Sequence, residues 1–83
     1  MSTSPLQQVT VIVREIAQDP AIDLTQTSRL EDIVGIDSMD IVSIAVEAEC
    51  RFGIVFDVED IGQLVTVGDL LRLIAEKRIL TAA

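Results

Sequence analysis

Apolar residues near the start of the chain recur at intervals of three and four, as on one face of a helix. They are Leu6, Val9, Ile12, Val13, Ile16 and Ala17. Ser4-Pro5 precedes them, and serine as a cap with proline at the first position favours a helix start. We therefore predict a helix over residues 5–18, ended by Asp19-Pro20, although the β-branched run 9–13 alone would favour a strand.

The clearest helical pattern runs from Ser38 to Phe52. One arc of about 100° on a helical wheel collects the expected core face: Ile41, Ile44, Ala45, Ala48 and Phe52. The nearly opposite side, where a simple amphipathic helix is polar, carries Met39, Val42 and Val46, with the carboxylates Asp40, Glu47 and Glu49 along its edges. An apolar strip edged by carboxylates is typical of a protein-docking face. The alternative is that the preceding loop folds over it.

That loop spans about 18 residues, and loops of this length are usually functional or contain a short element. Gly35 is expected to serve a turn before the helix. After Phe52, a capped helical turn is expected near residues 57–61, closed by Gly62. Residues 66–69 resemble a capping box with Asp in place of Glu, followed by a last helix. Its buried stripe is Leu70, Leu71, Leu73 and Ile74, and Lys77 and Arg78 near its end suit the helix dipole.

This order predicts an all-α fold, a small irregular four-helix bundle with three main helices, one short helix and a long first loop. The 83 residues form one domain over positions 1–83. With 14 acidic and 6 basic residues the net charge is −8, which repels nucleic acid and anionic membranes and favours basic protein surfaces as partners. No apolar run approaches the roughly 18 residues of a membrane span. A monomeric cytoplasmic protein is expected.

The chain has no histidine and one cysteine, Cys50. A serine nucleophile usually needs a neighbouring base, and metal sites need clustered ligands, so neither a self-activated Ser38 nor a metal site is expected. Ser38 could still be a helix cap, a phosphorylation site or a point of attachment. An enzyme with an all-carboxylate site is disfavoured.

Residues 30–40, Leu-Glu-Asp-Ile-Val-Gly-Ile-Asp-Ser-Met-Asp, resemble the acyl carrier proteins of fatty acid and polyketide synthesis, whose stretch ends in Gly-x-Asp-Ser-Leu-Asp. The similarity continues through Phe52 to Ile74. It implies a carrier, not an enzyme, with 4'-phosphopantetheine from coenzyme A attached covalently at Ser38 by a phosphopantetheinyl transferase. The arm would hold acyl groups as thioesters. Asp37 would contact the transferase or its metal ion, cap the helix, or do both.

The resemblance also implies partner enzymes with basic patches, such as ketosynthases and acyltransferases. They would read a surface made of Met39, Asp40, Val42, Val46, Glu47 and Glu49. Residues that could line an acyl pocket are Ile44, Ala48 and Phe52, although plain core packing explains them equally well. Met39 replaces the usual Leu, and Ser43, Cys50 and Arg51 stand where acidic residues are usual, which points to a specialised pathway as readily as to general fatty acid synthesis. A D-alanyl or peptidyl carrier and a non-carrier helical interaction module are the alternatives.

Overall fold

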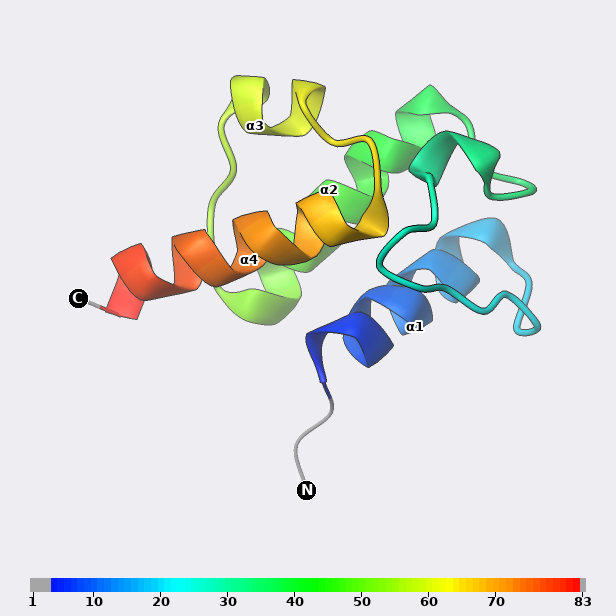
Figure 1. Ribbon diagram of the computed structural model, residues 1–83, viewed down its shortest axis with the longest axis horizontal. Coiled ribbons are helices and arrows are strands. Elements are labelled where there is room, and N and C mark those ends of the chain that lie inside the picture. The colour runs from blue at the N-terminus through cyan, green and yellow to red at the C-terminus, as the bar shows by residue number, and fades with distance from the viewer. Residues whose placement is uncertain (1–3, 83) are drawn as a thin grey trace.

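The computed structural model describes residues 4–82 of the chain, and their side chains as far as residue 78. Its elements in chain order are α1 (Pro5–Ala17), the 3-10 turn η1 (Leu30–Asp32), α2 (Ser38–Phe52), α3 (Val58–Gly62) and α4 (Val67–Ala82). Helices α1, α2 and α4 pack on one another, and the short α3 links the end of α2 to α4 (Figure 1). The predicted all-α bundle is confirmed. None of the described helices is long and apolar enough to cross a membrane.

Helix α1 begins with a reciprocal cap. The Ser4 hydroxyl accepts the backbone N–H of Gln7 at 3.2 Å, and the Gln7 side chain accepts that of Ser4 at 3.1 Å. Val9, Ile12 and Val13 are fully buried. Burial of this stripe outweighs the β propensity of the run, because propensity is a weak preference that tertiary packing overrides. The helix ends at Ala17, one residue before the predicted end, and Gln18 adopts a left-handed conformation with φ 56°.

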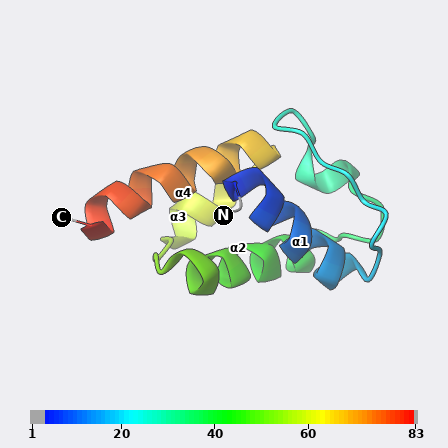
Figure 2. The same cartoon turned by 90° about the horizontal axis from the view of Figure 1, so that it is seen from below.

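The long loop gathers at the end of the bundle where α1 stops and both α2 and α4 begin (Figure 2). Backbone hydrogen bonds pin it to the start of α4: Leu30 N to Val65 O at 2.9 Å, Val67 N to Ser28 O at 2.9 Å and Gly68 N to Gln26 O at 2.8 Å. Leu24, Leu30 and Ile33 anchor it in the core. The loop is thus an ordered part of the fold, and Gly35 makes the expected turn with φ +88°.

Helix α4 has the capping box expected from the sequence. Thr66 Oγ1 accepts the N–H of Asp69 and Asp69 Oδ2 accepts the N–H of Thr66, each at 3.1 Å. The dipole role expected for Lys77 and Arg78 is wrong, because α4 continues to Ala82 and its last turn contains no basic residue.

Lys77 instead ties α4 to α3. Its Nζ lies 3.0 Å from Asp60 Oδ2 and 3.9 Å from Asp57 Oδ2. The Arg78 guanidinium lies 5.7 Å from the centre of the Phe52 ring, at the end of α2. Both basic residues therefore hold neighbouring elements against α4.

Candidate functional site

Ser38 is the first residue of α2, and its side chain is exposed. Asp37 directly before it is the N-cap: Asp37 Oδ1 accepts the N–H of Asp40 at 2.9 Å, and Asp40 Oδ2 accepts the N–H of Asp37 at 3.1 Å. This reciprocal cap fixes where the helix begins. Ser38 is consequently held as the first helical residue, because the carboxylates of Asp37 and Asp40 each bind a backbone N–H next to it.

The start of α2 keeps free hydrogen-bond donors. The N–H of Asp40 meets the Asp37 side chain, and that of Ile41 donates to Asp37 O at 3.2 Å. Within the described part of the chain, the N–H groups of Ser38 and Met39 and the Ser38 hydroxyl have no hydrogen-bond partner. Free N–H groups and the positive end of the helix dipole favour an anion here. Asp37 opposes a second negative charge, but its carboxylate is already turned to the Asp40 N–H.

The three apolar residues on the outer side of α2 are exposed as the wheel predicts. Met39 is 77% exposed, Val42 46% and Val46 48%. We call these three residues the α2 apolar strip. The loop lies at the end of the bundle and does not cover the strip, so the alternative of a loop folded over it is not observed. The strip begins one residue after Ser38, so any protein that reaches the serine comes close to it.

The carboxylates that flank the strip have different surroundings. Asp40 belongs to the cap, and Glu47 is partly buried without a hydrogen bond or ion pair among the described residues. Glu49 Oε2 accepts the backbone N–H of Phe56 at 2.7 Å, which holds the connection from α2 to α3. Sequence reasoning missed this structural role, because it depends on how the chain turns back after Gly53.

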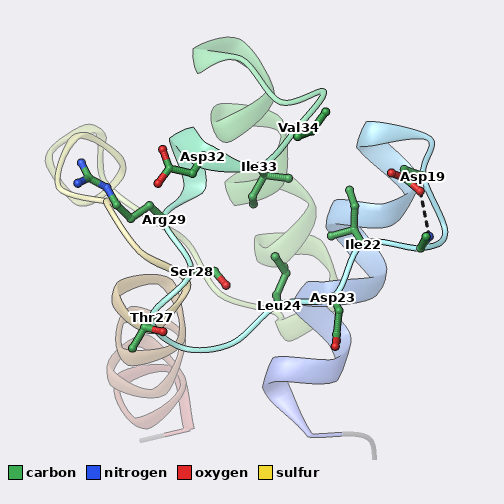
Figure 3. Close-up of a pocket in the computed structure, with 11 residues that line it drawn as sticks. Asp19, Ile22, Asp23, Leu24, Thr27, Ser28, Arg29, Asp32, Ile33 and Val34 are labelled. Carbon is green, nitrogen blue, oxygen red and sulfur yellow. Dashed lines mark hydrogen bonds between the residues drawn. The ribbon is translucent and has the colours of Figure 1, made fainter.

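The residues considered for an acyl pocket belong to the core. Ile44 and Ala48 have no exposed surface, and Phe52 is a partly buried residue packed against the core. A surface hollow of about 560 Å³ lies elsewhere, within the long loop (Figure 3). None of the three candidates lines it. Sequence patterns do not reveal this hollow, since its walls come from both arms of one irregular segment.

Among the described residues, no group of three or more His, Cys, Asp or Glu side chains could hold a metal ion. Cys50 is an exposed free thiol on α2. The groups around Ser38 are thus one free hydroxyl, two free N–H groups and two carboxylates, Asp37 and Asp40, each of which accepts a backbone N–H of the other residue. This set can carry a phosphate ester, but neither carboxylate is hydrogen-bonded to the Ser38 hydroxyl, whose proton must leave when the ester forms.

Residues 7–74 match the family model described as a phosphopantetheine attachment site. The chain therefore belongs to this family of carrier proteins, which are not enzymes and take 4'-phosphopantetheine as a covalently attached cofactor. The donors at the start of α2 fit the phosphate of that group.

Within the family the chain is similar to acyl carrier proteins. It is 31% identical to the one from Acidothermus cellulolyticus over 82% of this chain and 81% of that protein. It is 36% identical to the acyl carrier protein from Thermobifida fusca over 76% of this chain and 80% of that protein. The solution structure of holo acyl carrier protein from Geobacter metallireducens superposes with a TM-score of 0.81 at 30% identity, covering 93% of this chain and 88% of that one. The crystal structure of acyl carrier protein from Thermotoga maritima has the same fold. It superposes with a TM-score of 0.80 at 19% identity, covering 90% of this chain and 87% of that one.

Proposed function

We propose that Ser38 carries the 4'-phosphopantetheine arm and that the chain presents acyl thioesters on it to enzymes of fatty acid, polyketide or related specialised synthesis. The observation that supports this most is the start of α2, where an exposed hydroxyl stands beside two free N–H groups. The expected cytoplasmic location and monomeric state belong to this proposal.

Attachment is a phosphoryl-group transfer. Ser38 Oγ forms a bond to the phosphorus next to pantetheine in coenzyme A, the pyrophosphate P–O bond breaks, and adenosine 3',5'-bisphosphate leaves. The hydroxyl proton passes to a base of the transferase, because no described side chain accepts it in this chain. The N–H groups of Ser38 and Met39 then face the negative phosphodiester. Asp37 positions Ser38 through the cap and is our candidate for contact with the transferase.

The α2 apolar strip and its flanking carboxylates would bind the transferase and acyl-processing enzymes such as ketosynthases and acyltransferases. Apolar contact supplies affinity, and negative charge steers basic patches toward Ser38. Asp40 and Glu47 are the better candidates for steering. Glu49 is also part of the proposed partner-binding surface, although one of its carboxylate oxygens accepts the backbone N–H of Phe56.

The attachment site is tested by incubating the protein with coenzyme A and a broad-specificity phosphopantetheinyl transferase and measuring intact mass. We expect an increase of one phosphopantetheinyl group in wild type and none in Ser38→Ala. Ser43→Ala is the matched control, since Ser43 lies on the same helix and its hydroxyl only donates to Met39 O at 3.4 Å. A mass increase that survives Ser38→Ala would rule out Ser38.

The steering role requires variants that remove charge and keep the cap. Asp40→Asn retains an oxygen that can accept the Asp37 N–H, whereas charge reversal at this position would break the cap. We expect Asp40→Asn with Glu47→Gln to slow modification at low salt and to reduce its salt dependence. Glu76→Gln, an exposed change on α4, is the control. Equal rates in all variants at low salt would argue against steering.

A further inference from the structure

The long loop surrounds a hollow with walls on several sides. Figure 3 shows one arm of the loop descending from Asp19 to Leu24 and the other rising from Thr27 to Val34, with α2 behind them. The volume, about 560 Å³, is within the range of roughly 300–1,000 Å³ found for small-molecule sites. Its walls are formed by Asp19, Ala21, Ile22, Asp23, Leu24, Thr27, Ser28, Arg29, Asp32, Ile33 and Val34.

The lining combines two kinds of surface. Apolar side chains come from Ile22, Leu24, Ile33 and Val34, and hydroxyl and carboxylate oxygens from Thr27, Ser28, Asp19, Asp23 and Asp32. Three carboxylates against one guanidinium give a net negative wall that disfavours a phosphate. Figure 3 also shows the Arg29 side chain directed away from the hollow. The lining fits a neutral ligand with apolar groups and amide N–H donors.

We infer that this hollow shelters the pantetheine portion of the arm carried by Ser38. The inference rests on the proposed function and adds where the arm lies. Pantetheine is neutral and alternates methyl and methylene groups with two amides, as this lining requires. Val34, an apolar residue 85% exposed at the hollow, would be covered by the arm.

The arm can reach the hollow from its point of attachment. Val34 lies four residues before Ser38, so their Cα atoms are at most about 14 Å apart. From Ser38 Oγ to its sulfur, the arm has about as many main-chain bonds as five residues, or roughly 16 Å when extended. A tethered ligand also meets its site at a local concentration on the order of millimolar, so modest complementarity is enough.

The core is a less accessible alternative. Ile44 and Ala48 have no exposed surface, so a group entering between α1, α2 and α4 must first separate packed side chains. The hollow is already open. No residue of the α2 apolar strip lines the hollow, so an arm held there leaves the strip free for a partner.

The test compares apo and phosphopantetheinylated protein by NMR, with Cys50→Ser throughout so that the arm holds the single thiol. We expect amide and methyl shifts at Ile22, Leu24 and Ile33 on modification. Ala21→Trp fills the hollow from an exposed wall position and should abolish them. Ala75→Trp places the same ring on the exposed face of α4 and should leave them unchanged.

Alkylation of the arm thiol supplies a second readout. We expect it to be several-fold slower than that of free pantetheine, and Ala21→Trp should restore the faster rate. Shift changes confined to the start of α2, or centred on Ile44, Ala48 and Phe52, would overturn the inference without needing either tryptophan variant to fold. A protein that gains no mass would instead contradict the proposed attachment, so the two failures are distinguishable.

Discussion

Gly68 lies where the first loop meets the start of α4, and replacing it with alanine tests whether that contact holds the loop. Its N–H donates to Gln26 O at 2.8 Å, and an added Cβ would lie only 2.9 Å from the same oxygen. Thr66 Oγ1 would be 3.5 Å away. Because the blocking atom belongs to the backbone, it can move only if the loop moves, which also strains the neighbouring bond from Val67 N to Ser28 O.

The expected loss follows from two opposing effects. Crowding an ordered site costs roughly 1–3 kcal/mol, and removing a glycine from a helix returns roughly 0.5–1 kcal/mol. Gly68→Ala should therefore lower the free energy of unfolding by about 1.3 kcal/mol, the centre of a difference that spans about 0–2.5 kcal/mol. Gly62→Ala is the matched control. It has no atom within 4 Å of its added Cβ and no positive φ, and should gain about 0.4–1 kcal/mol.

Urea unfolding followed by far-UV circular dichroism measures both variants, since the chain has no tryptophan or tyrosine to follow by fluorescence. The midpoint of Gly68→Ala should lie about 2 M below that of Gly62→Ala, taking a slope near 1 kcal/mol/M for so small a domain and adding the central values of the loss and the gain. Amide exchange of Leu30 and Val67 should accelerate in Gly68→Ala alone. If Gly68→Ala were as stable as Gly62→Ala, the loop would not be held by this contact.

Two further predictions concern the ionised groups of α4. Backbone N–H groups of Thr66 and Val65 hold the pKa of Asp69 below its ordinary value, so its stabilising effect is present above the unfolded-state pKa and lost as pH falls through the folded-state pKa. Asp69→Asn should thus be less stable than wild type at about pH 7 and nearly equal at about pH 2, and a constant difference in urea titrations would contradict this. Lys77→Met removes the cation next to Asp60 and should speed amide exchange in α3 while barely changing the global midpoint. High salt should speed amide exchange of α3 in wild type but not in Lys77→Met. Equal protection of the α3 amides from exchange in the two proteins would show that the ion pair of Lys77 with Asp60 does not hold α3 against α4.

The sequence predicts the elements well because three of them carry strong local signals. Ser4-Pro5, the wheel from Ser38 to Phe52 and the box at residues 66–69 each combine a cap with an apolar stripe, and each begins a helix in the structure. The predicted core face of α2 faces the core: Ile44, Ala45 and Ala48 are fully buried, and Ile41 and Phe52 are partly buried and pack against it. At these positions the local sequence pattern and the tertiary packing favour the same structure, so the pattern alone is enough to predict the helix and its buried face.

The remaining features depend on contacts between distant segments. The ion pair of Lys77 with Asp60 and the bond from Phe56 N to Glu49 join elements whose approach no periodicity reveals. The loop hollow arises because buried Leu24 and Leu30 fold an irregular segment into two arms. Such features depend on which distant segments the fold brings together, and the structural preferences of single residues do not predict this.

The loop also decides which helix start can accept an anion. All three long helices begin with a reciprocal cap, so the caps alone do not distinguish them. Proline removes the first N–H of α1, and the loop carbonyls of Ser28 and Gln26 accept the first two N–H groups of α4.

At the start of α2, Ser38 and Met39 meet no acceptor among the described residues. The loop places its carbonyl groups against the start of α4, where they accept backbone N–H groups. The N–H groups of Ser38 and Met39 at the start of α2 therefore stay free beside the serine hydroxyl. A phosphate on Ser38 would therefore gain donors that α4 has already used. Val67, the first residue of α4, is also fully buried, so that helix start offers neither the free donors nor the exposure found at Ser38.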